Sequence, residues 1–138
     1  MPYRLLLVSF VLGALVACGG PSATPTPTFA RYTADDVTKV LMPLGITDIK
    51  EGARDPKSVA PNTYTAAQEF SIPSIAPKGG QVQVFASASD LAAMQAWYAR
   101  FPDLAPYVYV KGNALVQLNN TLPKAEAEKF RAAVEGMR

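Results

Sequence analysis

The chain has 138 residues, with 13 Lys and Arg, 11 Asp and Glu, one Cys and no His. Because His is the side chain that most often titrates near neutral pH and binds metal ions, its absence excludes His-dependent catalysis and His-ligated metal sites. One Cys allows no intramolecular disulfide and no Cys-x-x-Cys motif. A formal net charge of +2 is too small to indicate a nucleic-acid partner. The length predicts a single domain.

The N-terminus has the pattern of an export signal. Arg4 precedes an uncharged and mainly apolar run from Leu5 to Ala17, and Cys18 follows directly. A positive end, a short apolar run and small residues before a cleavage site are typical of a secretory signal peptide. The run is shorter than the ~20 residues that a membrane-spanning helix needs. We therefore expect residues 1–17 to direct export and then to be removed.

The sequence Leu15-Val16-Ala17-Cys18 resembles the lipobox of bacterial lipoproteins, and this resemblance concerns the N-terminus alone. It implies that signal peptidase II recognises Leu15, Val16 and Ala17 and cuts before Cys18, whose thiol carries a diacylglyceryl group. Acyl chains hold a protein on a membrane because each buried CH₂ contributes ~0.8 kcal/mol. The resemblance thus implies an exported protein, attached by lipid to the outer face of the inner membrane or to the outer membrane. The covalent lipid on Cys18 is the only non-protein group that we expect, with no metal and no other cofactor.

A spacer separates this anchor from the folded part. Residues 18–28 are rich in Gly, Pro and Thr and contain no charged residue. Such a composition favours an extended, flexible segment over a packed one. From Phe29 onward the composition is that of a folded protein, so we predict one globular domain at residues 29–138.

The first half of this domain predicts one helix and two strands. Thr33 and Asp36 form the N-cap pair of the helix, and Pro43 with Gly45 ends it. Four apolar residues at helical spacing are expected to face the core: Val37, Val40, Leu41 and Leu44. A short strand is predicted at 46–51, a long loop at 52–65 and an alternating strand at 67–72.

A second strand and a second helix are predicted next. The strand covers residues 81–86, after a connection at 73–80 in which Gly79 and Gly80 are interpreted as a turn. Ser87 and Asp90 predict the start of the helix. Its apolar stripe consists of Leu91, Met94, Tyr98 and Phe101.

The last third predicts a hairpin and a third helix. Residues 107–110 and 114–118 are the two strands, and Gly112 with Asn113 suits the tight turn between them. Thr121 is the expected N-cap of the helix, whose apolar stripe consists of Ala127, Phe130, Val134 and Met137. The elements together predict an α+β two-layer sandwich, with a small antiparallel sheet of about 4–5 strands packed by about three helices.

Carboxylates are the remaining candidates for acid–base or metal chemistry. Asp48, Glu51 and Asp55 cluster beside the long loop and contain the oxygen ligands that Ca²⁺ prefers. Three basic residues alternate with them, which favours a solvated surface of mixed charge. Asp55 and Glu69 are the pair that a glycoside-cleaving enzyme would need to hold close together.

Aromatic and amide side chains predict a binding face. Tyr107 and Tyr109 alternate with valines on one strand, and Gln83 and Phe85 lie on a neighbouring strand. If the valines face the helices, these four residues share the open face of the sheet. Such a face offers a glycan or a protein partner a large and rigid contact area. The alternative is that the tyrosines face the core.

These observations favour a non-enzymatic, lipid-anchored cell-envelope protein with an α+β binding or interaction domain. Its expected partners are the membrane, through the anchor, and an envelope protein or a cell-wall component. One alternative is a structural or accessory subunit of an envelope complex. The other is a carboxylate-based envelope hydrolase.

Overall fold

The computed structural model describes residue 29 and residues 32–138. Cys18, the expected recognition residues Leu15, Val16 and Ala17, and the 18–28 spacer lie outside the described residues. The predictions about export, cleavage and lipid attachment therefore stay predictions.

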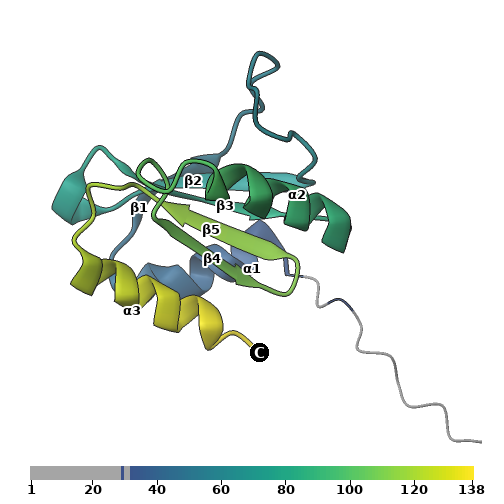
Figure 1. Cartoon of the computed structure of the whole chain (residues 1–138). Helices are drawn as coiled ribbons and strands as arrows, with labels where there is room; N and C mark the ends of the chain where they lie inside the picture. Colours follow the sequence, from purple (N-terminus) through teal and green to yellow (C-terminus); the bar gives the residue numbers. More distant parts are fainter. Residues whose placement is uncertain (1–28, 30–31) are drawn as a thin grey trace, which may run out of the picture.

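The described residues form an α+β fold around one antiparallel sheet of five strands, as Figure 1 shows. The strands are β1 (Thr47–Glu51), β2 (Ala66–Ser71), β3 (Gly79–Val84), β4 (Tyr107–Lys111) and β5 (Ala114–Leu118), and their spatial order is β1-β2-β3-β5-β4. The predicted class, an α+β sandwich with a small antiparallel sheet, is confirmed. Strands β3 and β5 are interior strands, so each has a hydrogen-bonded neighbour along both edges.

Helix α1 (Ala34–Leu41) begins with the predicted capping box. The Thr33 side chain accepts a hydrogen bond from the Asp36 amide, and the Asp36 carboxylate accepts one from the Thr33 amide. Hydrogen bonds from the Thr33 amide and hydroxyl to the carboxylate lower the pKa of Asp36. A 3₁₀ turn, Met42–Leu44, follows and ends at Gly45, whose φ of 83° suits glycine.

The prediction that Val40 faces the core was wrong. Val40 is exposed, whereas Thr38 is buried. The Thr38 hydroxyl donates to the side-chain oxygen of Gln68 on β2, a contact that turns this side of the helix toward the sheet. A polar residue with a specific partner therefore takes the place that apolar spacing assigned to a valine.

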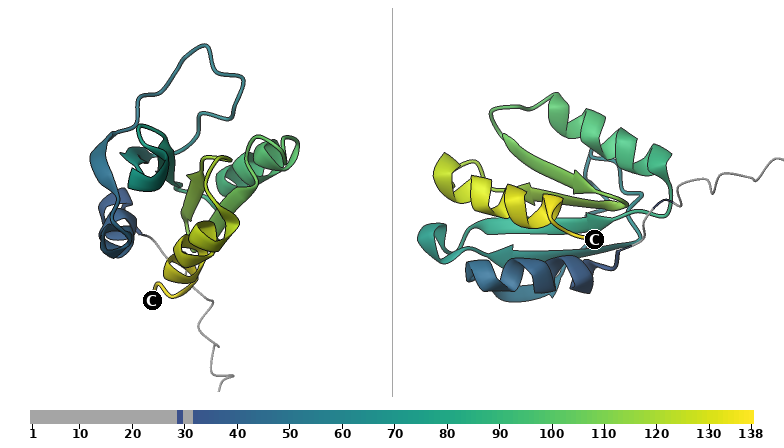
Figure 2. Two further views of the ribbon diagram at one scale, coloured as in Figure 1. Left: turned by 90° about the vertical axis from the view of Figure 1, so that its left-hand side faces the viewer. Right: turned by 90° about the horizontal axis from the view of Figure 1, so that it is seen from below.

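Helices α1 and α3 (Lys124–Glu135) cover one face of the sheet, as Figure 2 shows. The predicted stripe of α3 is confirmed, because Ala127, Phe130, Val134 and Met137 are all buried. The predicted N-cap is wrong: α3 starts after Pro123 without a side-chain cap. Thr121 instead donates its amide and hydroxyl hydrogens to the side chain of Asn119, which forms a turn before the helix.

Helix α2 (Ala88–Ala99) lies on the opposite face of the sheet (Figure 2). Ser87 caps it by accepting a hydrogen bond from the Asp90 amide, as predicted. Leu91, Met94 and Tyr98 are buried, as predicted, whereas Phe101 lies beyond the end of the helix and is exposed, so its predicted place in the stripe was wrong. Each helix therefore packs against the sheet, but α2 covers only part of its face.

Gly79 and Gly80 belong to β3, which corrects the predicted turn and moves the strand from 81–86 to 79–84. They pair with Ser71 and Phe70 on β2. A Cβ atom on Gly79 would lie 1.8 Å from the carbonyl oxygen of Phe70. The two glycines are therefore needed for close approach of the strands rather than for a turn.

The Asn113 side chain connects the beginning of the domain to the β4–β5 turn by hydrogen bonds. Its side-chain nitrogen donates to the carbonyl oxygens of Tyr32 and Phe85, and its side-chain oxygen accepts from the Tyr32 amide. Gly112, with a φ of 56°, occupies the other turn position. Because the Asn113 side chain is buried, this contact holds the chain at Tyr32 against the end of the hairpin.

Candidate functional site

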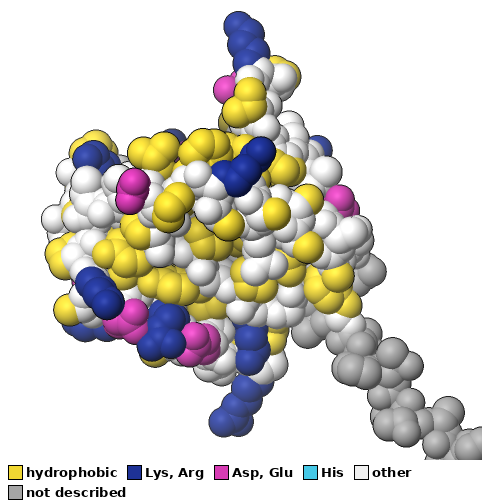
Figure 3. Space-filling model, in the orientation of Figure 1, with side chains coloured by type: hydrophobic (Ala, Val, Ile, Leu, Met, Phe, Trp, Pro, Cys, Tyr) yellow, Lys and Arg dark blue, Asp and Glu magenta, His cyan; other side chains and the backbone are white. Residues whose placement is uncertain are grey.

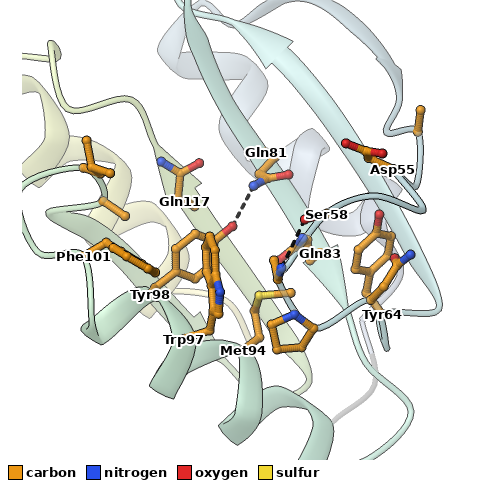
Figure 4. A pocket seen from close by; sticks show the side chains of 16 residues that line it. Asp55, Ser58, Tyr64, Gln81, Gln83, Met94, Trp97, Tyr98, Phe101 and Gln117 are labelled. Atoms are coloured by element: carbon orange, nitrogen blue, oxygen red, sulfur yellow. Dashed lines mark hydrogen bonds between the residues drawn. The ribbon is translucent and has the colours of Figure 1, made fainter.

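A cavity of about 390 Å³ lies on the α2 face of the sheet (Figure 4). The sheet forms its floor, α2 and the segment after it form one wall, and the 52–65 loop forms the other. Its lining consists of Ala53, Asp55, Ser58, Ala60, Pro61, Asn62, Tyr64, Gln81, Gln83, Met94, Trp97, Tyr98, Phe101, Leu104, Ala105 and Gln117. A volume of this size accommodates a small organic molecule.

Three glutamines form the floor. Gln81 and Gln117 are directly opposite each other on β3 and β5, and Gln83 lies two residues along β3 on the same face. Side chains on a strand alternate between the two faces. The same alternation therefore places Val82 and Val116 under α1 and α3 and the amides in the cavity.

Two of the three amide groups each use one of their two N–H donors within the protein. The nitrogen of Gln81 donates to the Tyr98 hydroxyl at 2.7 Å, and that of Gln117 donates to the Leu118 carbonyl at 2.6 Å. The side-chain oxygen of Gln83 is buried and receives no hydrogen bond from any described residue. An unsatisfied buried acceptor costs about 1–3 kcal/mol, so this atom lowers the stability of the empty cavity.

Aromatic rings and a thioether form the α2 wall. The Trp97 ring lies 5.1 Å, between centroids, from the rings of both Tyr98 and Phe101, and Met94 lies beside it toward the floor (Figure 4). Burial raises the pKa of Tyr98 to about 12, although the hydrogen bond from Gln81 opposes this shift. Tyr98 is therefore a neutral phenol at physiological pH.

The 52–65 loop forms the opposite wall and projects from the top of the molecule in Figure 1. Arg54 donates to the Tyr64 carbonyl and lies over the Tyr64 ring, 5.0 Å from its centroid. The Asp55 carboxylate accepts a hydrogen bond from the Lys57 amide. These contacts give the loop a defined shape, with Tyr64 and Asp55 on the cavity side (Figure 4).

The predicted binding face does not form. Tyr107 and Tyr109 pack against the core under α1 and α3, and the Tyr109 hydroxyl donates to the Ala127 carbonyl of α3. Burial raises the pKa of Tyr109, as expected for a ring in this position. Gln83 lies on the other face, where it lines the cavity, and Phe85 is buried beneath α2. Val108 and Val110, which alternate with the tyrosines on β4, face α2. The alternative prediction, that the tyrosines face the core, is therefore correct.

The carboxylates that the sequence suggested for catalysis or metal binding do not lie together in one site. Glu69 forms an ion pair with Lys50 at 3.2 Å, and both line a separate hollow with Asp48. Asp55 lines the cavity, and Glu51 lies outside it. Among the described residues, no three carboxylates or other metal-binding side chains are close enough to hold a metal ion. The arrangement gives no support to Asp55 and Glu69 as a catalytic pair.

Sequence reasoning found Gln83 but missed Gln81, Gln117 and Trp97 as parts of one site. The signal was present as three glutamines at alternating positions among valines and leucines in central strands, where apolar residues are the rule. The missing step was that α2 returns to this face and that the long loop covers it.

Charged side chains of both signs lie together on the face of the molecule that Figure 3 shows. Basic and acidic side chains alternate there along α3, where Arg131 pairs with Glu128 and Glu135. Apolar surface lies across the middle of the same view.

Comparison with known protein families, with curated proteins and with solved structures found no match to this chain. Within the part of the chain that the structure describes, no helix is long and apolar enough to cross a membrane.

The same substitution at two glutamines of β3 is expected to have opposite effects on stability. Gln83→Met removes the buried oxygen that lacks a partner, so the free energy of unfolding is expected to rise by about 1 kcal/mol. Gln81→Met removes the hydrogen-bond partner of the buried Tyr98 hydroxyl. It is expected to lower the free energy of unfolding by about 1 kcal/mol. Urea unfolding of the two variants and the wild type measures both changes. Equal losses in the two variants would contradict the assignment of Gln83 as unsatisfied.

The raised pKa of Tyr98 predicts that the protein loses stability at high pH. Its pKa is about 12 in the folded state and ~10 in an unfolded chain, so the folded protein holds this proton more tightly. The stabilisation is complete below about pH 10 and is lost as the pH rises to about 12, by roughly 2–3 kcal/mol. The measurement is the difference in unfolding free energy between the wild type and Tyr98→Phe across this range. A constant difference would show that Tyr98 titrates normally.

Proposed function

We propose that this chain is an exported, lipid-anchored and non-enzymatic binding protein of the bacterial cell envelope, and that the cavity between α2 and the sheet is its binding site. The observation that supports binding most directly is the amide floor. A sheet face between apolar walls is most stable when it is apolar, but this one carries Gln81, Gln83 and Gln117. Polar groups at such a cost are typical of sites that meet a ligand.

The lining favours binding over catalysis. Asp55 is the only acidic or basic residue in its lining, because the other side chains are amides, hydroxyls, aromatic rings and apolar groups. General acid–base catalysis needs groups that exchange protons near the working pH, and acyl transfer needs an activated nucleophile. An amide floor instead orients a ligand through hydrogen bonds.

The anchor is supported by the N-terminal sequence, in which the only Cys directly follows Leu15-Val16-Ala17. A tethered binding domain is a simple way to keep a receptor at a membrane while its cavity faces the surrounding compartment. The alternative of an accessory subunit uses the same anchor but requires no ligand in the cavity.

The lipid anchor is tested by substituting Cys18. We expect labelled palmitate to be incorporated into the wild type, and the mature protein to fractionate with membranes. Cys18→Ser removes the thiol and is expected to abolish both. Ser9→Ala, a change within the expected signal peptide that leaves the lipobox intact, is the matched control and is expected to behave as the wild type. Label that persists on Cys18→Ser would rule out this anchor.

Occupancy of the cavity is tested by native mass spectrometry of the full chain released from its own membrane. We expect an added, non-covalent mass on the wild type. Ala105→Phe places a ring in the cavity lining and is expected to remove that mass, whereas Ala93→Phe, at an exposed position of α2 outside the lining, is expected to keep it. A mass that is absent from the wild type, or equal in both variants, argues for the accessory-subunit alternative.

A further inference from the structure

We infer that the cavity binds an organic cation, an ammonium group attached to an apolar or aromatic body. This inference rests on the proposed function, because it names the class of ligand for the same cavity. Three features of the lining support it: the buried amide oxygen that no described residue satisfies, the aromatic walls, and the single charge at the rim.

The floor has a buried acceptor that no described residue satisfies. The side-chain nitrogens of Gln81 and Gln117 each donate one hydrogen, to Tyr98 and to the Leu118 carbonyl, and each amide keeps a second N–H and its oxygen for other partners. The Gln83 oxygen is buried and receives no hydrogen bond from any described residue. A ligand that brings N–H donors satisfies this oxygen, and a ligand that brings only acceptors does not.

The walls favour a positive charge beside an apolar body. Trp97 and Tyr98 lie on one side of the cavity and Tyr64 lies on the other, with the amides between them (Figure 4). The faces of aromatic rings attract cations, Trp more strongly than Tyr, and the attraction increases when the cation is desolvated. Because the Tyr64 ring already holds the Arg54 guanidinium, Trp97 and Tyr98 are the rings that offer this attraction to a ligand. Met94 and Leu104 provide apolar contact for the remainder of the ligand.

The charge of the site is negative. Asp55 is the only charged residue among the 16 that line the cavity. The nearest cation in sequence, Arg54, stacks on Tyr64 and lines a different hollow, together with Glu51 and Gly52. The Asp55 carboxylate accepts one backbone hydrogen bond, from Lys57, and has lone pairs left for a ligand. An ammonium group is therefore matched in sign, whereas a carboxylate ligand is repelled.

A neutral saccharide fits this lining less well. Sugar hydroxyls can meet the donors and acceptors of the floor amides, but a neutral ligand leaves the Asp55 carboxylate without an opposite charge. The glycan interpretation of an aromatic and amide-rich face thus becomes the competing outcome of the test.

The ligand class is tested with four small probes in the Cys18→Ser full chain. They are 2-phenylethylammonium, 2-phenylethanol, 3-phenylpropionate and methyl glucoside. Trp97 is the only Trp in the chain, so its fluorescence reports on the cavity directly. We expect saturable binding of the ammonium probe with a Kd at least tenfold lower than that of the alcohol, and no detectable binding of the carboxylate.

Matched variants separate charge recognition from general apolar binding. Asp55→Asn keeps the oxygen that accepts from the Lys57 amide and removes the charge. It is expected to raise the Kd of the ammonium probe about tenfold and to leave the Kd of the alcohol unchanged. Glu51→Gln removes an equal charge outside the lining and is expected to change neither probe more than twofold.

The two proposals fail in different ways. Tighter binding of the alcohol, the carboxylate or the glucoside than of the ammonium probe would overturn the ligand class and leave the cavity as a binding site. Equal weakening of ammonium binding by Asp55→Asn and Glu51→Gln would also overturn the ligand class. It would show that the probe responds to the overall charge of the protein and not to the carboxylate in the lining. If none of the four probes changes Trp97 fluorescence, the ligand class fails, and a co-purifying mass that Ala105→Phe removes would still support the proposed function.

Discussion

The alternation of side chains along the two central strands is the constraint on which the rest of the structure depends. On β3 and β5, Val82 and Val116 point to one face, and Gln81 and Gln117 point to the other. The apolar face holds α1 and α3 through a continuous core. The amide face is too polar to be covered in the same way, so α2 packs beside it and the 52–65 loop closes it from the other side. One strand pair thereby produces both the core and the cavity.

Much of the fold was predictable because its signals are local. The capping box at Thr33, the cap at Ser87 and the stripe of α3 each depend on residues within a few positions of one another, and all three predictions are confirmed. The errors come from contacts between distant segments. Gly79 and Gly80 form a turn by local rules but a strand in the protein, because the Phe70 backbone approaches Gly79 too closely for any side chain. No local pattern contains that contact.

The candidate site was less predictable than the fold for the same reason. Gln83 was identified from its strand, but the choice of face for Tyr107 and Tyr109 depended on which side each helix packs. A tyrosine at a half-buried strand position suits either face, and the hydrogen bond from Tyr109 to α3 decides between them. The Trp97 ring and the Asp55 carboxylate reach the cavity from segments about forty residues apart in sequence, so only the tertiary structure brings them together.

The position of Arg54 gives the cavity its charge. Arg54 and Asp55 are adjacent in sequence, and in an extended loop their charges would largely cancel. Stacking of the guanidinium on Tyr64, together with its hydrogen bond to the Tyr64 carbonyl, holds the positive charge in a neighbouring hollow and leaves Asp55 at the cavity rim. The contact therefore has two consequences: it orders the loop that forms the second wall, and it separates two opposite charges. The cavity thus has one unsatisfied amide oxygen on its floor and a carboxylate at its rim with lone pairs left after its bond from Lys57, and a cationic ligand supplies N–H donors for both.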